Sequence, residues 1–498
     1  MMKNNKSGCE SKIKIWLAAI FLCTILLSAC APSDPPRFLV VSPTSTVISP
    51  NETITPFPTR PVYAPGTLVD YTVQSGDTLP GLAARFNTSV DEILDANPNI
   101  PSDASTMPPG MPMQIPIYYR PLWGPDFQII PDSSFVNGPQ ALGFNVISFI
   151  NSSPGWLKDY EAYSLGRQLS GAETLQWVAV NYSINPKVLI ALVEYQVNAL
   201  TNPERDTESE ETLLGHEVIT HKGVYLQISY AANLLNDGYY GWRTGGLTTF
   251  EHTDGSLESP DPWQNAATVA LQHYFSNIYD RDDYLRAIGP DGFIKTYQSM
   301  FGDPWQDEQA HIPGSLRQPE MILPFDVGKT WALTGGPHTG WGSLAPWAAV
   351  DFAPPSVVGG CAPTNELSTA VAAGIVARTG PGIVVLDLDG DGDERTGWVV
   401  FYLHVAAEGM VAEGTWLEAG DPIGHPSCEG GHSTGTHIHI ARKYNGEWIP
   451  ADGVIALNLS GWVAVNGDKP YQGYMFKDDL IAIANPNPDN HSFITAGE

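Results

Sequence analysis

The chain has 498 residues, which is more than one hydrophobic core usually organises, so we expect several domains. Its formal net charge of −29 argues against a nucleic acid or an anionic surface as the main partner, because like charges repel. Aromatic residues make up 10% of the chain, and it holds 48 Gly and 42 Pro. This composition favours short strands and loops beneath a solvated acidic exterior.

Residues 1–29 have the pattern of an export signal. Four lysines precede the apolar run IWLAAIFLCTILL, which is short for a membrane-spanning helix of about 20 residues. The run ends in LSAC and resembles the bacterial lipoprotein signal, which implies cleavage before Cys30 and lipidation of that cysteine. An uncleaved anchor helix is the alternative. Both interpretations place the rest of the chain outside the cytoplasm, tethered to a membrane.

Residues 30–66 are predicted to form a tether. Nine prolines between Pro32 and Pro65 alternate with Ser and Thr, a composition that cannot pack a core and favours extended chain. At about 3.1 Å per residue, such a segment would hold the folded parts on the order of 100 Å from the membrane.

Residues 67–118 predict a small βααβ module. A short strand leads through the turn SGDT into a helix with apolar residues at helical spacing, Thr88 or Ser89 can cap a second helix, and MQIPI forms the closing strand. These segments resemble a LysM domain, which implies binding to glycans that contain N-acetylglucosamine. The resemblance places the glycan-binding residues in two loops, namely Gly76, Asp77, Thr78 and Leu79, and Asn97, Pro98, Asn99 and Ile100.

Residues 119–320 read as mainly helical. Ser170 and Glu173 form a predicted capping box, and Asn185 caps a second helix that has Pro186 at its first position. The acidic run from Glu204 to Glu211 is predicted to be a solvated loop, since its like charges repel.

The helix PKVLIALVEYQ in this region resembles the lysozyme-like fold of transglycosylases, in which such a helix presents a catalytic glutamate near its end. The catalytic Glu-Ser pair of that family aligns here with Gln196 and Val197. The amide of Gln196 cannot donate the proton that the acid of a glycosidase must give. We therefore interpret the region as a degenerate or structural module. A catalytic role for Glu194, two residues earlier, is the alternative.

The last third of the chain holds the residue types of a catalytic zinc site. His437 and His439 are two residues apart in STGTHIHIA, so their side chains point to the same face of a strand. His338, Asp351 and His439 are the expected ligands, while His437 and His404 remain to move a proton and to stabilise an oxyanion. Two neutral imidazoles and one carboxylate leave Zn²⁺ with net positive charge, which lowers the pKa of a bound water from 15.7 to about 7. The alternative for each histidine is a structural role in the core or at a sheet edge.

The segment from about residue 321 to 465 resembles the lysostaphin/LytM-type and β-lytic (LasA-type) zinc endopeptidases, which cut peptide cross-links in bacterial cell walls. In that family a ligand histidine precedes an aspartate, a Tyr-x-His stretch lies on a later strand, and a Gly-rich loop leads to His-x-His. The matching segments here are His338, Asp351, YLH ending at His404, and GGHSTGTHIHI. The long gap between His338 and Asp351 resembles the gap found in the β-lytic branch.

Two further features lie inside this segment. Cys361 and Cys428 are the cysteines left after the signal and the lipidation site, and an oxidising compartment favours a disulfide between them over two unpaired thiols. The second feature is the turn DLDGDGDE, which resembles the start of a calcium loop with ligands Asp387, Asp389, Asp391 and Asp393. Its twelfth position is Trp398, where a calcium loop has glutamate, so an acidic turn held open by glycine is the alternative.

The sequence thus predicts a multidomain chain with a LysM module, a mainly α lysozyme-like middle domain and a mostly antiparallel β peptidase domain over residues 321–498. We expect an extracytoplasmic, lipid-anchored zinc metalloendopeptidase of the bacterial cell envelope, whose partners are peptidoglycan and the membrane. A non-catalytic glycan-binding scaffold that activates another wall hydrolase is one alternative. A lytic transglycosylase using Glu194 is the other.

Overall fold

The computed structural model describes residues 60–118, 120, 122–205, 211–217, 219–356 and 358–497. All of these belong to one compact unit, Val47–Glu498. The predicted export signal, the lipidation site Cys30, most of the tether and residues 206–210 of the acidic run lie outside the described residues. Within the described part of the chain, no helix has both the length and the apolar character needed to cross a membrane.

The LysM-like segment folds as the predicted βααβ module. Its elements in chain order are β1 (Thr67–Thr72), α2 (Leu79–Phe86), α3 (Val90–Ala96) and β2 (Pro112–Ile117). The two strands pair antiparallel, with Thr67 opposite Ile117. Of the two candidate caps for the second helix, Ser89 is the one that the structure shows, because its side chain accepts the backbone N–H of Glu92. The Glu92 carboxylate in turn accepts the backbone N–H of Ser89, so the helix begins with a capping box.

The middle region is helical, as predicted. Both expected helix starts are present, because the Ser170–Glu173 capping box begins α6 and Asn185 with Pro186 begins α7. The helices are α4 (Asp132–Phe135), α5 (Val146–Ser152), α6 (Gly171–Tyr182), α7 (Pro186–Val197), α9 (Val224–Thr244), α10 (Ala266–Ile278), α11 (Arg281–Ile288) and α12 (Phe293–Phe301). Two small hairpins also form, β3 (Glu161–Ser164) with β4 (Arg167–Ser170) and β5 (Phe250–Glu251) with β6 (Leu257–Glu258).

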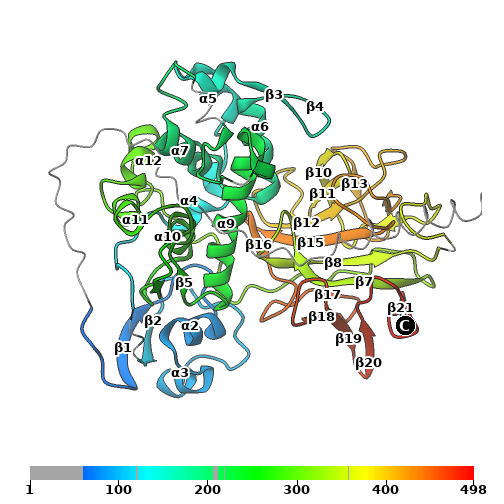
Figure 1. Cartoon of the computed structure of the whole chain (residues 1–498). Coiled ribbons are helices and arrows are strands. Elements are labelled where there is room, and N and C mark those ends of the chain that lie inside the picture. The colour runs from blue at the N-terminus through cyan, green and yellow to red at the C-terminus, as the bar shows by residue number, and fades with distance from the viewer. Residues whose placement is uncertain are drawn as a thin grey trace, which may run out of the picture. The chain divides into compact units, whose positions relative to one another are not determined.

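The carboxy-terminal region is an antiparallel β structure, which confirms the predicted fold class. Its main sheet has the strand order β13-β10-β11-β12-β15-β8-β7-β21, with β16 paired to β15 (Figure 1). These strands are β7 (Thr330–Thr339), β8 (Trp347–Ala353), β10 (Gly374–Gly380), β11 (Ile383–Asp387), β12 (Trp398–Leu403), β13 (Trp416–Leu417), β15 (Ile438–Tyr444), β16 (Glu447–Ile449) and β21 (Phe493–Thr495). Two smaller sheets contain β9 (Ser368–Thr369) with β14 (Pro422–Gly424), and β17 (Asn458–Leu459), β18 (Trp462–Asn466), β19 (Gly473–Lys477) and β20 (Leu480–Ile483).

Alternate residues of the main sheet belong to two different cores, as the period of a strand requires. On β12, Val399 and Phe401 join the core of the helical region, whereas Val400 and Tyr402 join a second core on the opposite face. The second core also contains residues of the small sheet β17-β18-β19-β20. The main sheet is therefore covered on both faces.

The helical and β regions share a buried ionic junction at β16. The Glu447 carboxylate accepts hydrogen bonds from the Tyr239 hydroxyl (2.8 Å), from His311 Nε2 (2.7 Å) and from Arg243 Nη2 (3.1 Å). Arg243 Nη2 also lies 3.1 Å from Asp132 Oδ2. Because all five side chains are less than 10% exposed, each charge depends on its partners for the stabilisation that water would otherwise provide.

We expect this junction to make stability sensitive to acid. Burial alone would raise the pKa of Glu447, but Arg243 and His311 lower it to about 2, against an ordinary value of 4.5. Because the pKa of Glu447 is lower in the folded state, its ionised carboxylate stabilises the fold above pH 4.5. That contribution is lost as the pH falls towards 2 and the carboxylate becomes protonated. Glu447→Gln should therefore lower the free energy of unfolding by about 3 kcal/mol at pH 7 and make it less dependent on pH between 4.5 and 2.

Thermal unfolding followed by tryptophan fluorescence at several pH values measures both effects. Glu413→Gln, at an exposed carboxylate, is the matched control and should reproduce the wild-type curve. Overlapping pH curves for Glu447→Gln and the wild type would contradict the expected role of the junction.

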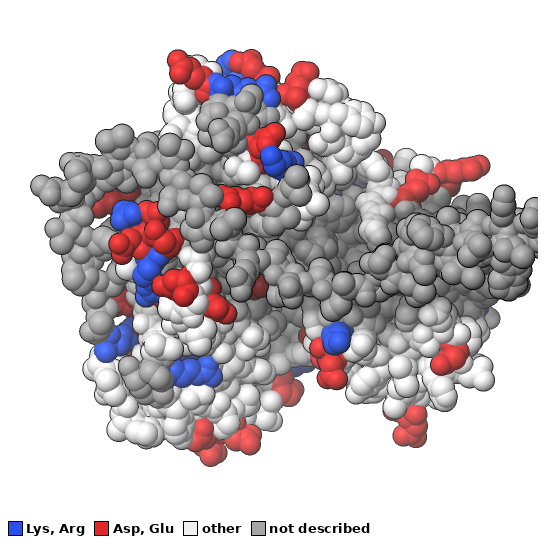
Figure 2. Space-filling view, viewed as in Figure 1, with Lys and Arg blue, Asp and Glu red and all other residues white. Residues whose placement is uncertain are grey.

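Many other acidic side chains lie on the surface. Figure 2 shows Asp and Glu spread over the visible face, with Lys and Arg among them. This distribution agrees with an acidic exterior and not with one concentrated charged site on that face.

Candidate metal centre

Three adjacent strands bring the predicted zinc ligands together. His439 on β15 lies directly opposite Asp351 on β8, and β7, which carries His338, pairs with the other edge of β8. The β7–β8 register shifts on both sides of His338, as at a β-bulge, and such bulges redirect side chains near functional sites. Residues more than 100 positions apart in sequence thereby share one face of the sheet.

The ligand atoms are close enough to bind one ion. Asp351 Oδ1 lies 3.3 Å from His338 Nε2 and 3.3 Å from His439 Nδ1, and the two nitrogens are 3.0 Å apart. All three side chains are buried, at 2%, 6% and 5% relative exposure for His338, Asp351 and His439. The mainly apolar β sheet thus surrounds a compact N, N, O cluster.

Backbone carbonyls set the tautomer of both histidines. His338 Nδ1 donates to Gly336 O (2.8 Å), and His439 Nε2 donates to Gly340 O (3.1 Å), because a carbonyl oxygen can only accept. The remaining nitrogens, His338 Nε2 and His439 Nδ1, therefore face each other and Asp351 with lone pairs. Carbonyl partners of this kind orient histidine ligands in metal sites.

Asp351 is the clearest sign that a cation belongs here. Among the described residues, its buried Oδ1 has no hydrogen-bond donor, which would be costly for an unpaired carboxylate. Gly335 leaves room for this group, since a Cβ at that position would lie 2.4 Å from Asp351 Oδ2. Two lone-pair nitrogens and one orphaned carboxylate oxygen are the donor set that Zn²⁺ binds in catalytic sites, so the residues fit the predicted ion.

The protonation states also suit a cation. Burial would raise the pKa of Asp351, but positive charge on the facing rings of His338 and His437 holds it well below the ordinary value, and a cation at the same place would act in the same direction. Burial lowers the pKa of His439. An ionised carboxylate and a neutral imidazole are the forms that coordinate metals.

His404 and His437 lie side by side next to the cluster. Their ring centroids are 4.4 Å apart, and His437 Nε2 is 3.7 Å from Asp351 Oδ1. His437 Nδ1 donates to Gly435 O (2.7 Å) and His404 Nδ1 donates to Glu429 O (2.8 Å), which leaves Nε2 of each ring unprotonated when the ring is neutral. Burial, with a smaller effect of His437, lowers the pKa of His404 to about 3. Both neutral rings therefore present a lone pair on Nε2, but the lowered pKa makes His404 a weak proton acceptor.

Tyr471 is a neighbour of the site that the sequence reasoning missed. Its ring stacks on His338 with centroids 4.0 Å apart and an interplanar angle of 21°, and its backbone N–H donates to Pro337 O (3.2 Å). Burial and the charge of Asp351 raise its pKa. The residue lies between β18 and β19, beyond the segment that carried the family resemblance, and no motif in its sequence marks it.

The other predicted site residues of the β region are the two cysteines and the acidic calcium-loop residues, and most of them lie close to their predicted partners. Cys361 and Cys428 form a disulfide. Asp387, Asp389 and Asp391 lie close enough to share an ion, and burial with a hydrogen bond to Asp389 raises the pKa of Asp387 to about 7.

Asp393 does not join this acidic group. Its carboxylate binds the Arg395 side chain through Oδ1 (2.7 Å) and Oδ2 (2.5 Å). Its carboxylate is therefore engaged by arginine in this structure, and its role as a further calcium ligand stays a prediction.

One of the two predicted glycan-binding loops is mostly buried. Gly76, Asp77 and Leu79 are buried, and the Asp77 carboxylate is held by Arg85 Nη1 (2.7 Å) and by the Tyr71 hydroxyl (2.7 Å). The rest of this predicted set is less buried, with intermediate or full exposure at Thr78, Asn97, Pro98, Asn99 and Ile100.

The helical region provides this cover. The Arg243 guanidinium of α9 donates to Ser75 O, and a Cβ on Gly76 would lie 2.8 Å from the guanidinium carbon. Gly76 and Thr78 line a cavity of about 690 Å³ that is also bordered by Tyr240 and Trp448. Gly76, Asp77 and Leu79 are therefore buried where α9 packs against their loop, and their role in glycan binding stays a prediction.

Glu194, the alternative catalytic acid, is buried, and both of its carboxylate oxygens accept hydrogen bonds from neighbouring residues. Its Oε2 accepts the backbone N–H of Leu200 (2.8 Å), its Oε1 accepts the Thr201 hydroxyl, and the side chain is 6% exposed. Gln196 is similarly engaged by the hydroxyls of Tyr274 and Tyr279. Both residues hold the end of α7 in place.

Comparisons with known proteins agree with this architecture. Residues 71–116 match the LysM domain family, and residues 128–314 match the family described as LasA, N-terminal domain. The second match covers most of the helical middle region. Protease LasA of Pseudomonas aeruginosa strain PAO1 is 24% identical over 341 residues, which cover 65% of this chain and 75% of that protein. The protein of the same name from strain UCBPP-PA14 is 24% identical over 340 residues, with the same coverage.

Solved structures with similarity to the β region include two peptidases. Pseudoalterin, a deep-sea M23 metalloprotease, is 22% identical and aligns with a TM-score of 0.28, covering 34% of this chain and 96% of that one. Lysostaphin of Staphylococcus simulans is 16% identical, with a TM-score of 0.18 and coverage of 35% and 90%. The chain is thus similar to protease LasA over 65% of its length and also contains a region that matches the LysM domain family.

Proposed function

We propose that this chain is a zinc metalloendopeptidase that hydrolyses the peptide cross-links of bacterial peptidoglycan. The observation that carries the proposal is the convergence of His338, Asp351 and His439 on one buried point, in a chain homologous to protease LasA. We place the peptidase domain at residues 321–498, the helical domain at 119–320 and the LysM module at 67–118. A lipid on Cys30 and a tether over residues 30–66 would hold the enzyme at a membrane of the cell envelope.

The chemistry follows from the geometry of the histidines. A bound Zn²⁺ would act as a Lewis acid towards the scissile carbonyl and lower the pKa of a nearby water. His437 has an unprotonated Nε2 directed at the ligand cluster, so it can take a proton from the attacking water and return it to the leaving amine. His404 could donate to the developing oxyanion only after gaining a second proton on Nε2, because its Nδ1 proton is engaged by Glu429 O, and the lowered pKa of its ring opposes that step.

The LysM module would keep the enzyme on its polymeric substrate. Binding of the module to glycan raises the local concentration of the peptidase near the peptide bridges. The loop from Asn97 to Ile100 carries this contact in our proposal, since Gly76, Asp77 and Leu79 are buried. The engaged carboxylate of Glu194 gives no support to a transglycosylase function.

Metal removal tests the proposal. Purified wall treated with the full chain should release peptide fragments with new free amino groups, and treatment with 1,10-phenanthroline should lower this release at least about a hundredfold, because the metal supplies several kcal/mol of transition-state stabilisation. One equivalent of Zn²⁺ should restore activity. Mass spectrometry of the fragments identifies the bond that is cut.

Three outcomes would contradict the proposal. Equal release with and without chelator would exclude a metal-dependent reaction. Fragments with anhydro sugar ends would instead show glycosidic cleavage by a transglycosylase. An intact wall in the presence of zinc-loaded protein would favour a scaffold that acts through another hydrolase.

A further inference from the structure

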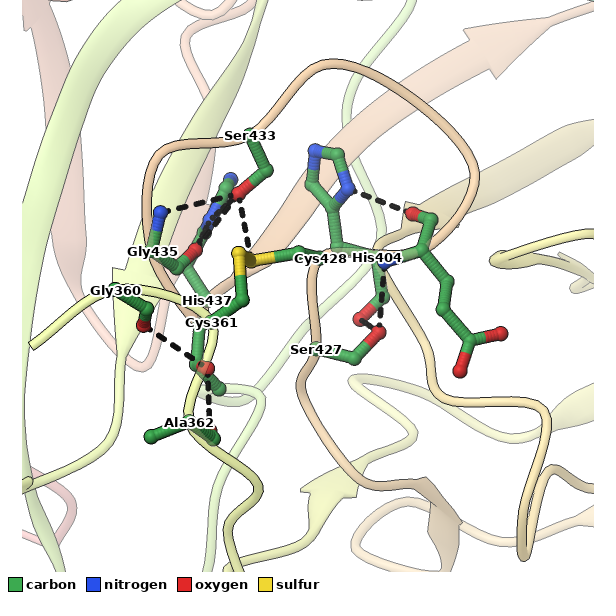
Figure 3. The surroundings of a disulfide bond; sticks show 11 residues. Gly360, Cys361, Ala362, His404, Ser427, Cys428, Ser433, Gly435 and His437 are labelled. Atoms are coloured by element: carbon green, nitrogen blue, oxygen red, sulfur yellow. Dashed lines mark hydrogen bonds between the residues drawn. A yellow bond between two sulfur atoms is a disulfide. The ribbon is translucent and has the colours of Figure 1, made fainter.

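The Cys361–Cys428 disulfide joins the two loops that surround the proton-accepting histidines (Figure 3). Cys361 lies between β8 and β9, and Cys428 lies between β14 and β15, 67 positions later in the sequence and at a Cα–Cα distance of 5.7 Å. Cys361 is solvent-exposed. The bond is therefore accessible to a reductant.

The loop of Cys361 supports the residue before His437. Gly360 O accepts the backbone N–H of Thr436 (3.0 Å), and Ala362 O accepts the Thr436 hydroxyl (2.6 Å). These two carbonyls belong to the residues on either side of Cys361. Thr436 is thus held in place by the loop that the disulfide anchors.

Ser433 connects the disulfide with the His437 ring. Its hydroxyl donates to Gly435 O (2.7 Å) and lies 3.3 Å from Cys428 Sγ and 3.3 Å from His437 Nδ1. His437 Nδ1 donates to the same Gly435 carbonyl (2.7 Å). Ser433 therefore helps to aim the carbonyl that sets the tautomer of His437.

The residues on either side of Cys428 support His404. The Ser427 backbone N–H and hydroxyl both donate to His404 O, at 2.7 and 2.9 Å, and His404 Nδ1 donates to Glu429 O at 2.8 Å. His404 has a positive φ of 68°, a conformation that a non-glycine residue adopts only when its surroundings hold it there. The loop around Cys428 supplies those contacts.

The metal-ligand cluster is held by different parts of the fold. His439 and Asp351 are opposite one another in the β15–β8 ladder, and His338 lies on β7. The outer nitrogens of the two histidine ligands bind Gly336 O and Gly340 O, which belong to β7 and to the residue that follows it. None of these described contacts involves the loop of Cys361 or the loop of Cys428.

We propose that the disulfide, together with Ser433, is a redox-sensitive positioning unit for His404 and His437. The proposal rests on the proposed peptidase function for these two histidines. A dithiol reductant would attack one sulfur through its thiolate, form a mixed disulfide and close to its own disulfide. The protein bond gains two electrons and two protons and becomes two thiols. The loops then lose their link, the two imidazoles lose their fixed orientation, and the three ligands stay in the sheet.

The test compares oxidised, reduced and reoxidised full-chain protein loaded with zinc. Tris(2-carboxyethyl)phosphine serves as the reductant because it lacks thiols that compete for zinc. Reduction should lower kcat for release of amino groups from purified wall by about ten- to a hundredfold, as a misplacement of about 1 Å does, while zinc content stays at one per chain. Reoxidation should restore kcat.

Two sets of variants refine the comparison. The double variant Cys361→Ser, Cys428→Ser should match the reduced wild type and no longer respond to the phosphine. Ser433→Ala should lower kcat without change in zinc content, and Ser433→Thr, which keeps the hydroxyl, should recover most of the lost turnover. Failure of the threonine variant to recover it would remove Ser433 from the proposal.

A second measurement does not depend on activity. Hydrogen exchange followed by mass spectrometry should show faster exchange over residues 425–437 on reduction, while residues 347–353 and 438–444 keep their protection. Unchanged exchange over 425–437, unchanged kcat, or zinc loss in parallel with kcat would each overturn the positioning role. If oxidised, zinc-loaded protein leaves the wall intact, the peptidase function fails, and the exchange result still decides whether the disulfide orders these loops.

Discussion

His439→Ala is expected to reduce zinc from one ion per chain to almost none and to lower kcat/KM for wall peptides by at least about a thousandfold. The substitution removes one of only two nitrogen ligands, and the remaining His338 and Asp351 cannot complete a three-ligand site. Metal analysis after gel filtration and a fragment-release assay measure the two effects. The strands themselves should persist, because β15 keeps its ladders with β8 and β12.

His432→Ala is the matched control for this variant. It removes an imidazole from the loop that leads to β15, but His432 is exposed and our assignment gives it no role in the cluster. It should keep both zinc and activity. A His439→Ala protein that retains a full equivalent of zinc and cuts the wall at the wild-type rate would end the case for this ligand set.

His437→Ala is expected to separate metal binding from turnover. Its Nε2 lies 3.7 Å from Asp351 Oδ1, but His437 is not one of the three proposed ligands, so zinc content should stay at one per chain. Loss of the proton acceptor should lower kcat by about 10² to 10⁴, the usual contribution of a positioned general base. Steady-state kinetics on a synthetic cross-link peptide, with parallel metal analysis, gives both values.

Stoichiometric zinc loss in His437→Ala would show that the roles of His437 and His439 are misassigned. A near-normal kcat would point to His404 as the main proton acceptor, since its ring lies 4.4 Å from that of His437 and also presents an unprotonated Nε2. The double variant His404→Ala, His437→Ala would then show the full loss.

Local features of the fold were predictable because they depend on neighbouring residues. The capping boxes at Ser89 and Ser170, and the start of α7 at Asn185, need only side chains three or fewer residues away. The βααβ order of the LysM module followed in the same manner from short apolar periods and turn residues. The lysozyme-like interpretation of the middle region stays a prediction, while residues 128–314 match the family described as LasA, N-terminal domain.

Contacts across long separations in sequence were not predictable. Tyr471 stacks on His338 from a loop 133 positions later, and Arg243 covers the LysM loop at Gly76 from another domain. The Glu447 junction likewise joins side chains from α9, β16 and the segment that links the helical and β regions. None of these contacts has a motif, since each depends on how separate elements pack.

The sequence by itself determined which residue types were available for the chemistry, namely two alternating histidines, an upstream histidine and aspartate, and a further histidine after a strand. Spacing of two residues is enough to place His437 and His439 on one face of β15, because side-chain direction in a strand alternates. Only the tertiary structure decided that His338 and Asp351 meet them. That meeting depends on the register of β7, β8 and β15, and on the backbone carbonyls that turn each imidazole towards the same point.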